Sequence, residues 1–124
     1  MIYTISKEFH FSASHQLTGL APDHPCMRLH GHNYRVEIVC QSMELDAHGF
    51  VVDYNDLKPF GDYLDQHLDH RHLNDVLGKH QTTAERIAMH LFTVAVGLDL
   101  PVVAIKVSET PKTWAEVSDE DLPY

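Results

Sequence analysis

The sequence predicts an α+β fold in which two helices cover one face of an antiparallel sheet, with elements in the order β-β-α-α-β-β. Residues 2–15 and 30–42 alternate apolar and polar side chains over lengths that suit long strands. Apolar residues then recur at spacings of three and four in two segments, as expected of amphipathic helices. Two shorter strand-like segments follow. Strands and helices are therefore segregated along the chain, which is typical of an α+β domain.

The bulk composition narrows the class of protein. At 124 residues the chain suits one domain, residues 1–124. Its formal charge of −9, with nine Lys and Arg scattered along the chain, argues against a nucleic-acid or membrane-surface partner. No apolar run approaches the roughly 20 residues of a membrane span, and the N-terminus does not look like a signal peptide. We therefore expect a cytoplasmic protein whose two cysteines are free thiols.

The first two strands carry histidines on their apolar faces. In residues 2–15 the odd positions form the apolar row, which Lys7 interrupts and His15 ends. In residues 30–42 the even positions form it, and His30 and His32 begin that row. Antiparallel pairing of the two strands would bring His15 close to both.

Three neutral imidazoles with a fourth position open are the ligand pattern of a catalytic zinc site. A single histidine on an apolar face is more often an ordinary core residue, but burying three without a ligand would be costly. Gly31, between the two histidines of the second strand, suits a crowded centre. A rival site built from His70 and His72, with His67, is weaker because no alternation places these residues on one strand face.

The loop between the first two strands is predicted to deliver Cys26 to the histidines. Gly19, Pro22 and Pro25 punctuate this loop. Beside a divalent metal, Cys26 could act as a thiolate base or nucleophile. It could equally be the fourth ligand of a closed structural site, and the spacing does not decide between these roles. Cys40 lies on the inner face of the second strand and is interpreted as a packing residue.

The predicted helices follow. The first begins near Asn55 as N-cap and tolerates Pro59 because that residue falls near its first turn. The segment 68–74 loses helical periodicity and is predicted to be a loop, in which Asp69 and His70 form a candidate acid/base pair or are simply loop residues. A capping box over residues 82–85 starts the second helix, whose stripe of Ile87, Leu91, Val94 and Leu98 is interpreted as core packing.

The last two strands are predicted at residues 102–107 and 113–117. Glu109 continues the inward phase of the first of these, so a carboxylate ends an apolar row. It either has a function there or turns to solvent. Pro111 ends the strand, and residues 118–121 are predicted to be a solvated acidic tail.

Taken together, these motifs resemble a known family. The resemblance covers nearly the whole chain and rests on six segments in order: residues 11–15, 26–32, 52–54, 68–74, 82–85 and 109–115. Each segment alone is weak, but the ordered set is highly specific. The chain resembles the 6-pyruvoyl-tetrahydropterin synthase and 6-carboxy-tetrahydropterin synthase family, which implies the tunnelling fold (T-fold).

The resemblance also implies roles for individual residues. His15, His30 and His32 would bind Zn²⁺, and Cys26 would be the proton-abstracting thiolate rather than a fourth ligand. Asp69 and His70 would form the acid/base pair. Glu109 would bind the pterin, whose amino and ring N–H donors suit a bidentate carboxylate. The family further implies a homohexamer of two stacked trimers, with active sites shared between subunits.

The implied substrate is 7,8-dihydroneopterin triphosphate. One branch of the family keeps a pyruvoyl side chain, and the other releases acetaldehyde and leaves a carboxylate for the queuosine-type deazapurine pathway. The short chain and the three residues between Cys26 and His30 resemble the carboxy-forming branch. The alternatives are the pyruvoyl-forming reaction and a non-catalytic pterin- or zinc-binding module. A triphosphate needs a basic lining in this acidic protein, and the candidates are Arg28, Arg71, Lys106 and Lys112.

Overall fold

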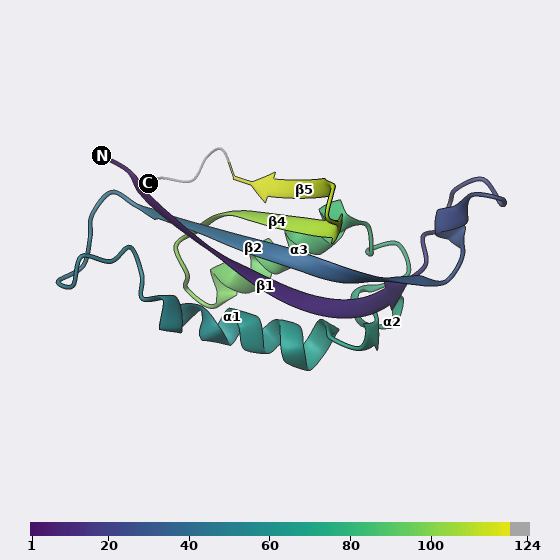
Figure 1. Ribbon diagram of the computed structural model, residues 1–124, viewed down its shortest axis with the longest axis horizontal. Helices are drawn as coiled ribbons and strands as arrows, with labels where there is room; N and C mark the ends of the chain where they lie inside the picture. Colours follow the sequence, from purple (N-terminus) through teal and green to yellow (C-terminus); the bar gives the residue numbers. More distant parts are fainter. Residues whose placement is uncertain (120–124) are drawn as a thin grey trace.

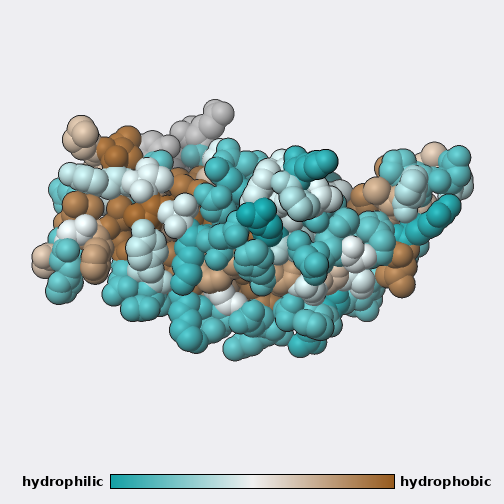
Figure 2. All heavy atoms as spheres, viewed as in Figure 1, coloured by the Kyte–Doolittle hydropathy of each residue, from teal (hydrophilic) through white to brown (hydrophobic). Residues whose placement is uncertain are grey.

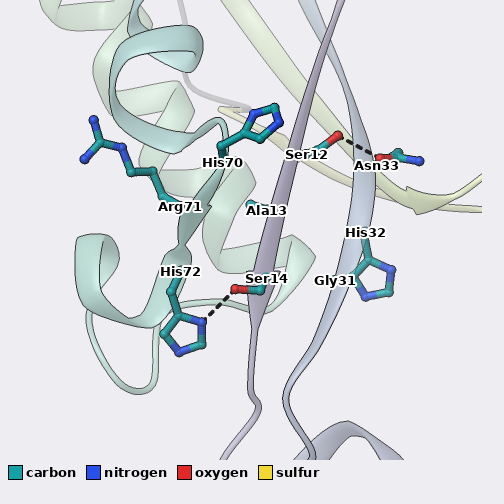
Figure 3. Close-up of a pocket in the computed structure, with 9 residues that line it drawn as sticks. All are labelled: Ser12, Ala13, Ser14, Gly31, His32, Asn33, His70, Arg71 and His72. Carbon is teal, nitrogen blue, oxygen red and sulfur yellow. Dashed lines mark hydrogen bonds between the residues drawn. The ribbon is translucent and has the colours of Figure 1, made fainter.

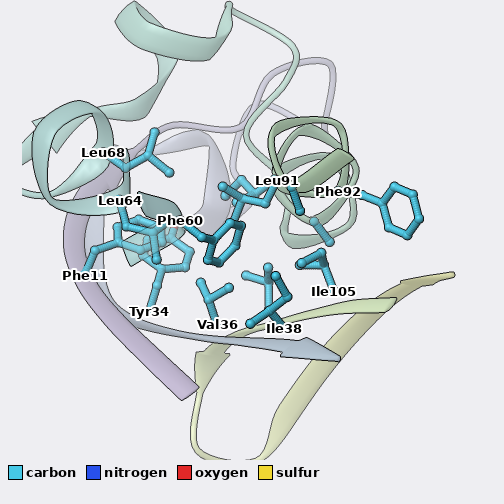
Figure 4. Packing of buried hydrophobic residues seen from close by; sticks show 14 of the residues in the cluster. Phe11, Tyr34, Val36, Ile38, Phe60, Leu64, Leu68, Leu91, Phe92 and Ile105 are labelled. Atoms are coloured by element: carbon cyan, nitrogen blue, oxygen red, sulfur yellow. The ribbon is translucent and has the colours of Figure 1, made fainter. Parts of the chain in front are cut away.

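The computed structural model describes residues 1–119 and contains one five-stranded sheet with helices packed on one face (Figures 1 and 4). The strand order is β3-β1-β2-β4-β5. The strands are β1 (Tyr3–His15), β2 (His30–Ser42), β3 (Arg71–His72), β4 (Val102–Thr110) and β5 (Thr113–Ser118). The helices are α1 (Lys58–Tyr63), α2 (Leu73–Leu77) and α3 (Ala84–Gly97), with short 3₁₀ turns η1 (Pro25–Met27) and η2 (Tyr54–Leu57) and a π-helical turn η3 (Leu64–Leu68).

The predicted pairing of the two long strands is confirmed. β1 and β2 are antiparallel and in register over their whole length, from Tyr3 opposite Ser42 to His15 opposite His30. From Ile5 onward in β1 and up to Cys40 in β2, each inward position is less exposed than the outward positions beside it, as the alternation of side chains predicts. Gly31 lies at a close approach of the strands, because a Cβ atom there would be 3.2 Å from the Ala13 carbonyl oxygen. The crowding that Gly31 relieves therefore comes from the neighbouring strand.

The first helical segment starts earlier than predicted. Asp53, not Asn55, is the N-cap, because its Oδ1 accepts the backbone N–H of Asn55 at 2.9 Å. The segment then passes from η2 through α1 into η3, and Pro59 lies in the first turn of α1, where its missing N–H costs little. Gly61 lets this helix approach the sheet closely, since a Cβ atom there would be 2.6 Å from a ring carbon of Phe9.

The prediction of a loop over residues 68–74 is wrong. Leu68 ends η3, Arg71 and His72 form β3, and α2 begins at Leu73. β3 runs parallel to β1, so the sheet is mixed rather than purely antiparallel. A strand of two residues is too short to show alternation. Its existence depends on the exposed edge of β1, which local sequence does not reveal.

Helix α3 has the predicted position with two corrections. Thr83 is its N-cap, not Thr82, because the Thr83 Oγ1 accepts the backbone N–H of Arg86 at 3.2 Å. Ile87 and Leu91 are buried as predicted, whereas Leu98 lies beyond the helix and is exposed. The helix ends at Gly97, so Leu98 falls outside the helical phase of the stripe.

The core lies between the inner face of the sheet and the helices (Figure 4). Phe11 stacks on Tyr34 with ring centroids 4.7 Å apart, and Phe60 and Leu91 meet the sheet from the helical side. Cys40 is fully buried, and burial raises the pKa of its thiol to about 11, in keeping with a packing role. The two predicted final strands are present as β4 and β5, which pair antiparallel as a hairpin. The predicted acidic tail begins inside β5, which includes Ser118, and residues 120–121 lie outside the described residues.

Several apolar side chains remain exposed at the end of the sheet where the N-terminus meets the loop of residues 43–54 (Figure 2). This apolar end patch comprises Met1, Ile2, Tyr3, Met43, Leu45, Phe50 and Tyr54. Exposed apolar side chains gathered in one place are typical of interaction surfaces. No helix among residues 1–119 is long and apolar enough to cross a membrane.

Candidate metal centre and active site

Strands β1 and β2 bring His15, His30 and His32 together at one end of the sheet. The ligand-capable nitrogens of these side chains all lie within 4.8 Å of one another. Their ring centroids are 4.5 to 5.1 Å apart. The His15 side chain is fully buried, and the other two are partly buried. Among residues 1–119 this is the one group of three or more His, Cys, Asp or Glu side chains arranged to hold a metal ion.

The hydrogen bonds of two rings show which nitrogens are available to a ligand. The Nδ1 of His15 lies 2.8 Å from the Thr82 carbonyl oxygen, and the Nδ1 of His30 lies 2.6 Å from the Arg28 carbonyl oxygen. A carbonyl oxygen only accepts, so each Nδ1 must carry the hydrogen. In the neutral rings both Nε2 atoms are therefore unprotonated, and they face each other at 2.9 Å.

Two lone pairs at this distance repel unless a cation lies between or beside them. Nε2 of His32 is also buried and has no hydrogen-bond partner among the described residues. Backbone carbonyls that fix the outer nitrogen are the usual second partners of metal-bound histidines. The donor set and its outer hydrogen bonds therefore fit a divalent transition metal such as Zn²⁺.

Burial favours the form of His15 and His32 that can bind a metal. Desolvation lowers the pKa of His15 and of His32, partly opposed at His15 by the Thr82 carbonyl and at both by the Glu109 carboxylate. A lowered pKa keeps the rings neutral at pH 7, and only a neutral imidazole offers a lone pair.

Glu109 lies next to this cluster. Its Oε2 is 3.5 Å from Nε2 of His32, and its side chain is 26 % exposed, so it is not turned fully to solvent. It lines a cavity of about 300 Å³ between the start of α3 and the β4–β5 hairpin, with Ala84, Glu85 and Trp114. The cavity thus combines an aromatic ring with a carboxylate that lies beside the histidine cluster.

Asp69 and His70 form a hydrogen-bonded pair on the other side of β1. The Asp69 Oδ1 accepts the backbone N–H of Ser12 at 2.8 Å, and its Oδ2 is 2.7 Å from Nδ1 of His70. The Ser12 N–H, and then the His70 ring, lower the pKa of the Asp69 carboxyl below its usual value. The carboxylate thus fixes the orientation of His70, whose side chain is 83 % exposed and leaves its Nε2 available.

The backbone around this pair is unusual in two respects. A π-helical turn, η3, directly precedes Asp69, and His70 has a positive φ of 57°. Both features concentrate at functional sites, because non-glycine residues adopt such conformations only where the surrounding structure holds them. The backbone N–H of His70 donates to the Ser12 carbonyl, which holds it here. Neither feature could be read from the sequence.

His70 also lines a cavity of about 500 Å³ between β1, β2 and β3 (Figure 3). His32 belongs to the same wall, and His72 is held there by Ser14 Oγ at 2.9 Å. The side chain of Arg71 turns away from β1 and donates to the Gln66 carbonyl at 3.0 Å. The rival metal site at His67, His70 and His72 is not among the metal-capable groups of residues 1–119.

Cys26 lies elsewhere. It belongs to η1, in the loop that extends past the end of the sheet (Figure 1), and it is not part of the metal-capable group. Its backbone donates to Nδ1 of His24 and accepts from Leu17. The predicted delivery of Cys26 to the histidines, and with it the closed site of one cysteine and three histidines, is therefore not formed within a single chain.

The chain is similar to known proteins over most of its length. The sequence model of the family described as 6-pyruvoyl tetrahydropterin synthase matches residues 4–120. A protein of Synechocystis named 6-carboxy-5,6,7,8-tetrahydropterin synthase is 38 % identical over 117 residues, which cover 88 % of each chain. A protein of Archaeoglobus fulgidus named as a putative enzyme of the same kind is 32 % identical, covering 94 % of this chain and 95 % of its own.

Solved structures agree on the fold. The 6-pyruvoyl tetrahydropterin synthase of Caenorhabditis elegans superposes with a TM-score of 0.84 at 25 % identity, covering 97 % of both chains. An uncharacterized protein of Wolinella succinogenes gives a TM-score of 0.81 at 26 % identity, covering 97 % of this chain and 99 % of its own. The expected tunnelling fold is confirmed, and the chain belongs to the 6-pyruvoyl tetrahydropterin synthase family.

Proposed function

We propose that this protein is a zinc-dependent lyase that converts 7,8-dihydroneopterin triphosphate into 6-carboxy-5,6,7,8-tetrahydropterin, releasing acetaldehyde and triphosphate. The observation that carries the proposal is the pair of Nε2 atoms of His15 and His30, which face each other at 2.9 Å while the buried Nε2 of His32 has no hydrogen-bond partner among the described residues. The names of the Synechocystis and Archaeoglobus relatives support the carboxy-forming reaction. The product would enter queuosine-type deazapurine synthesis, and the cytoplasmic location expected from the sequence remains a prediction.

His15, His30 and His32 would hold the metal, and the Thr82 and Arg28 carbonyls would orient two of the rings. When bound, Zn²⁺ would supply a Lewis acid for the oxygens of the substrate side chain. The remaining chemistry is proton transfer by the protein.

His70 is proposed as a general acid/base. Its Nδ1–H points to Asp69, so its exposed Nε2 can accept a proton from the substrate and return it. Asp69 stabilises the imidazolium while His70 holds the proton, and the Ser12 N–H keeps that carboxylate ionised. Cys26 is proposed as the second proton-transfer group, acting as a thiolate.

Glu109 is proposed to bind the pterin ring. A carboxylate can accept two parallel hydrogen bonds from the amino and ring N–H groups of a pterin. Two observations support this role: the cavity of about 300 Å³ that Glu109 lines has room for a bicyclic ring, and Glu109 lies 3.5 Å from His32 of the histidine cluster. Trp114, which also lines this cavity, gives the ring an aromatic neighbour.

The site is proposed to be completed by a neighbouring subunit in a homohexamer of two trimers. Cys26 does not belong to the metal-capable histidine group of its own chain, which supports a site that a second chain completes. The apolar end patch and the outer edges of β1 and β5 are the surfaces that support such an assembly. Light scattering of the purified protein tests the hexamer directly.

The decisive experiment is to incubate the zinc-loaded protein with dihydroneopterin triphosphate and assay acetaldehyde. Stoichiometric acetaldehyde and a carboxylated pterin support the proposal. A pyruvoyl product would instead support the sister reaction, which the description of the matching family also allows. Binding of the pterin with neither product would mean that the chain is a non-catalytic pterin- or zinc-binding module.

A further inference from the structure

A third cavity, of about 250 Å³, lies at the beginning of α3 and has a basic lining. Its polar wall consists of Thr18, Lys79, His80, Thr82, Thr83 and Arg86. No Asp or Glu among the described residues lines it, although the chain carries 18 acidic residues against nine Lys and Arg. The local charge of this basic cavity is therefore opposite to the net charge of the protein, which points to an anionic ligand.

The two permanent cations of the basic cavity have no acidic partner in the described part of the chain. Neither Lys79 nor Arg86 forms an ion pair with any residue in the range 1–119. Nη1 of Arg86 donates only to a neutral acceptor, Oε1 of Gln81, at 3.2 Å. Most donors of the guanidinium thus remain free for a bidentate anion.

Thr82 provides an independent indication of a ligand. Thr82 is one of the residues that line the basic cavity, its side chain is only 1 % exposed, and its Oγ1 has no hydrogen-bond partner among the described residues. A buried hydroxyl left without a partner is costly, so a missing partner is expected beside it. The N-terminus of the 14-residue helix α3 adds a partial positive charge at the same place.

The basic cavity adjoins the histidine cluster through this same residue. The Thr82 carbonyl accepts from Nδ1 of His15, and the same residue also lines the cavity. The four basic residues considered from sequence, Arg28, Arg71, Lys106 and Lys112, do not line it. Lys106 lies instead 3.8 Å from the Glu116 carboxylate.

We propose that the basic cavity is a polyphosphate subsite, which, given the proposed function, binds the triphosphate of the substrate. Elimination breaks a carbon–oxygen bond and leaves the electron pair on an oxygen of the departing triphosphate. Lys79 and Arg86 would stabilise that charge, and the Thr82 hydroxyl would donate to a phosphate oxygen. After turnover the subsite would retain triphosphate as a competitive inhibitor.

Calorimetric titration of the zinc-loaded protein with inorganic triphosphate tests the subsite without requiring turnover. We expect saturable binding that weakens with salt, and much weaker binding of orthophosphate. Lys79→Ala and Arg86→Ala should each lower the affinity roughly 10- to 100-fold, as loss of a charge-assisted hydrogen bond does. The matched control is Lys58→Ala, which removes an exposed lysine paired with Asp62 and should change nothing.

Thr82→Val distinguishes a ligand-binding hydroxyl from a structural one. Because the hydroxyl has no partner among residues 1–119, its replacement by a methyl group should leave the melting temperature unchanged or raise it, while weakening triphosphate binding. Equal affinity of wild type and the Lys79→Ala and Arg86→Ala variants for triphosphate would overturn the subsite, as would equal affinity for orthophosphate and triphosphate. Triphosphate binding that depends on these residues, in a protein without acetaldehyde production, would leave the subsite standing and reject only the proposed function.

Discussion

Replacing one histidine of the cluster should separate a metal site from a buried polar core. We consider His30→Ala, which removes one of the two facing Nε2 atoms, with His48→Ala as control because His48 is exposed in a distant loop. A metal that binds only the folded state at 1,000 times its Kd adds about 4 kcal/mol to the free energy of unfolding. For 124 residues, an unfolding entropy of about 2.1 cal/mol/K per residue converts this into a rise in Tm of roughly 16 °C.

The expected results differ in sign between the two forms of the protein. In metal-free protein the facing lone pairs of His15 and His30 contribute repulsion, so His30→Ala should lower Tm by little or raise it. With zinc, the variant should lose most of the zinc-dependent rise in Tm. Loss of a metal ligand weakens zinc binding by more than the 10- to 100-fold that is typical for loss of a hydrogen-bond partner of a ligand. The assay is scanning calorimetry with and without zinc, together with metal analysis of the dialysed protein.

An equal zinc-dependent rise in Tm for wild type and His30→Ala would refute the metal centre. So would a large loss of stability in metal-free His30→Ala, because that result would assign the histidine a purely structural role. His48→Ala should match wild type in both forms.

Four further predictions follow from the site and its surroundings. Cys26→Ala should retain zinc and the fold but lose turnover by roughly 10²- to 10⁴-fold, which steady-state kinetics and metal analysis would check; loss of the metal would argue for a structural ligand. Glu109→Gln should raise the KM for the pterin with zinc content unchanged, because an amide cannot accept both N–H groups. The lowered pKa of Asp69 means that its contribution to stability is present above about pH 4 and is lost as the pH falls through the lowered value. The free energy of unfolding, measured by denaturation at pH 7 and near pH 3, should therefore change less between these pH values for Asp69→Asn than for wild type. Burial lowers the pKa of His90, whose Nε2 lies 2.5 Å from the Tyr63 hydroxyl. Below the pKa of about 6.5 that a histidine has in the unfolded chain, the unfolded state therefore binds more protons than the folded state, and stability falls as the pH falls. Urea titrations at pH 7 and pH 5 should show a smaller decrease in the free energy of unfolding for His90→Asn than for wild type.

The sequence by itself determined the elements with a strong period. Alternation over residues 2–15 and 30–42 was enough to place His15, His30 and His32 on one inner face, because side chains of a strand alternate regardless of what packs on it. The stripe of α3 and the inward phase of Glu109 were equally readable. These are local patterns, and the fold realises them almost without change.

Only the tertiary structure decided the features that depend on contacts between distant residues. β3 exists because the edge of β1 accepts Arg71 and His72, and the same edge holds His70 in a left-handed conformation. The tautomers of His15 and His30 follow from carbonyls at Thr82 and Arg28, and the basic lining joins Lys79 and Arg86 to the loop after β1. The periodicity of a segment does not show which hydrogen-bond partners or charges from distant parts of the chain will contact it. Those contacts determine the chemistry of the site, so only the tertiary structure reveals it.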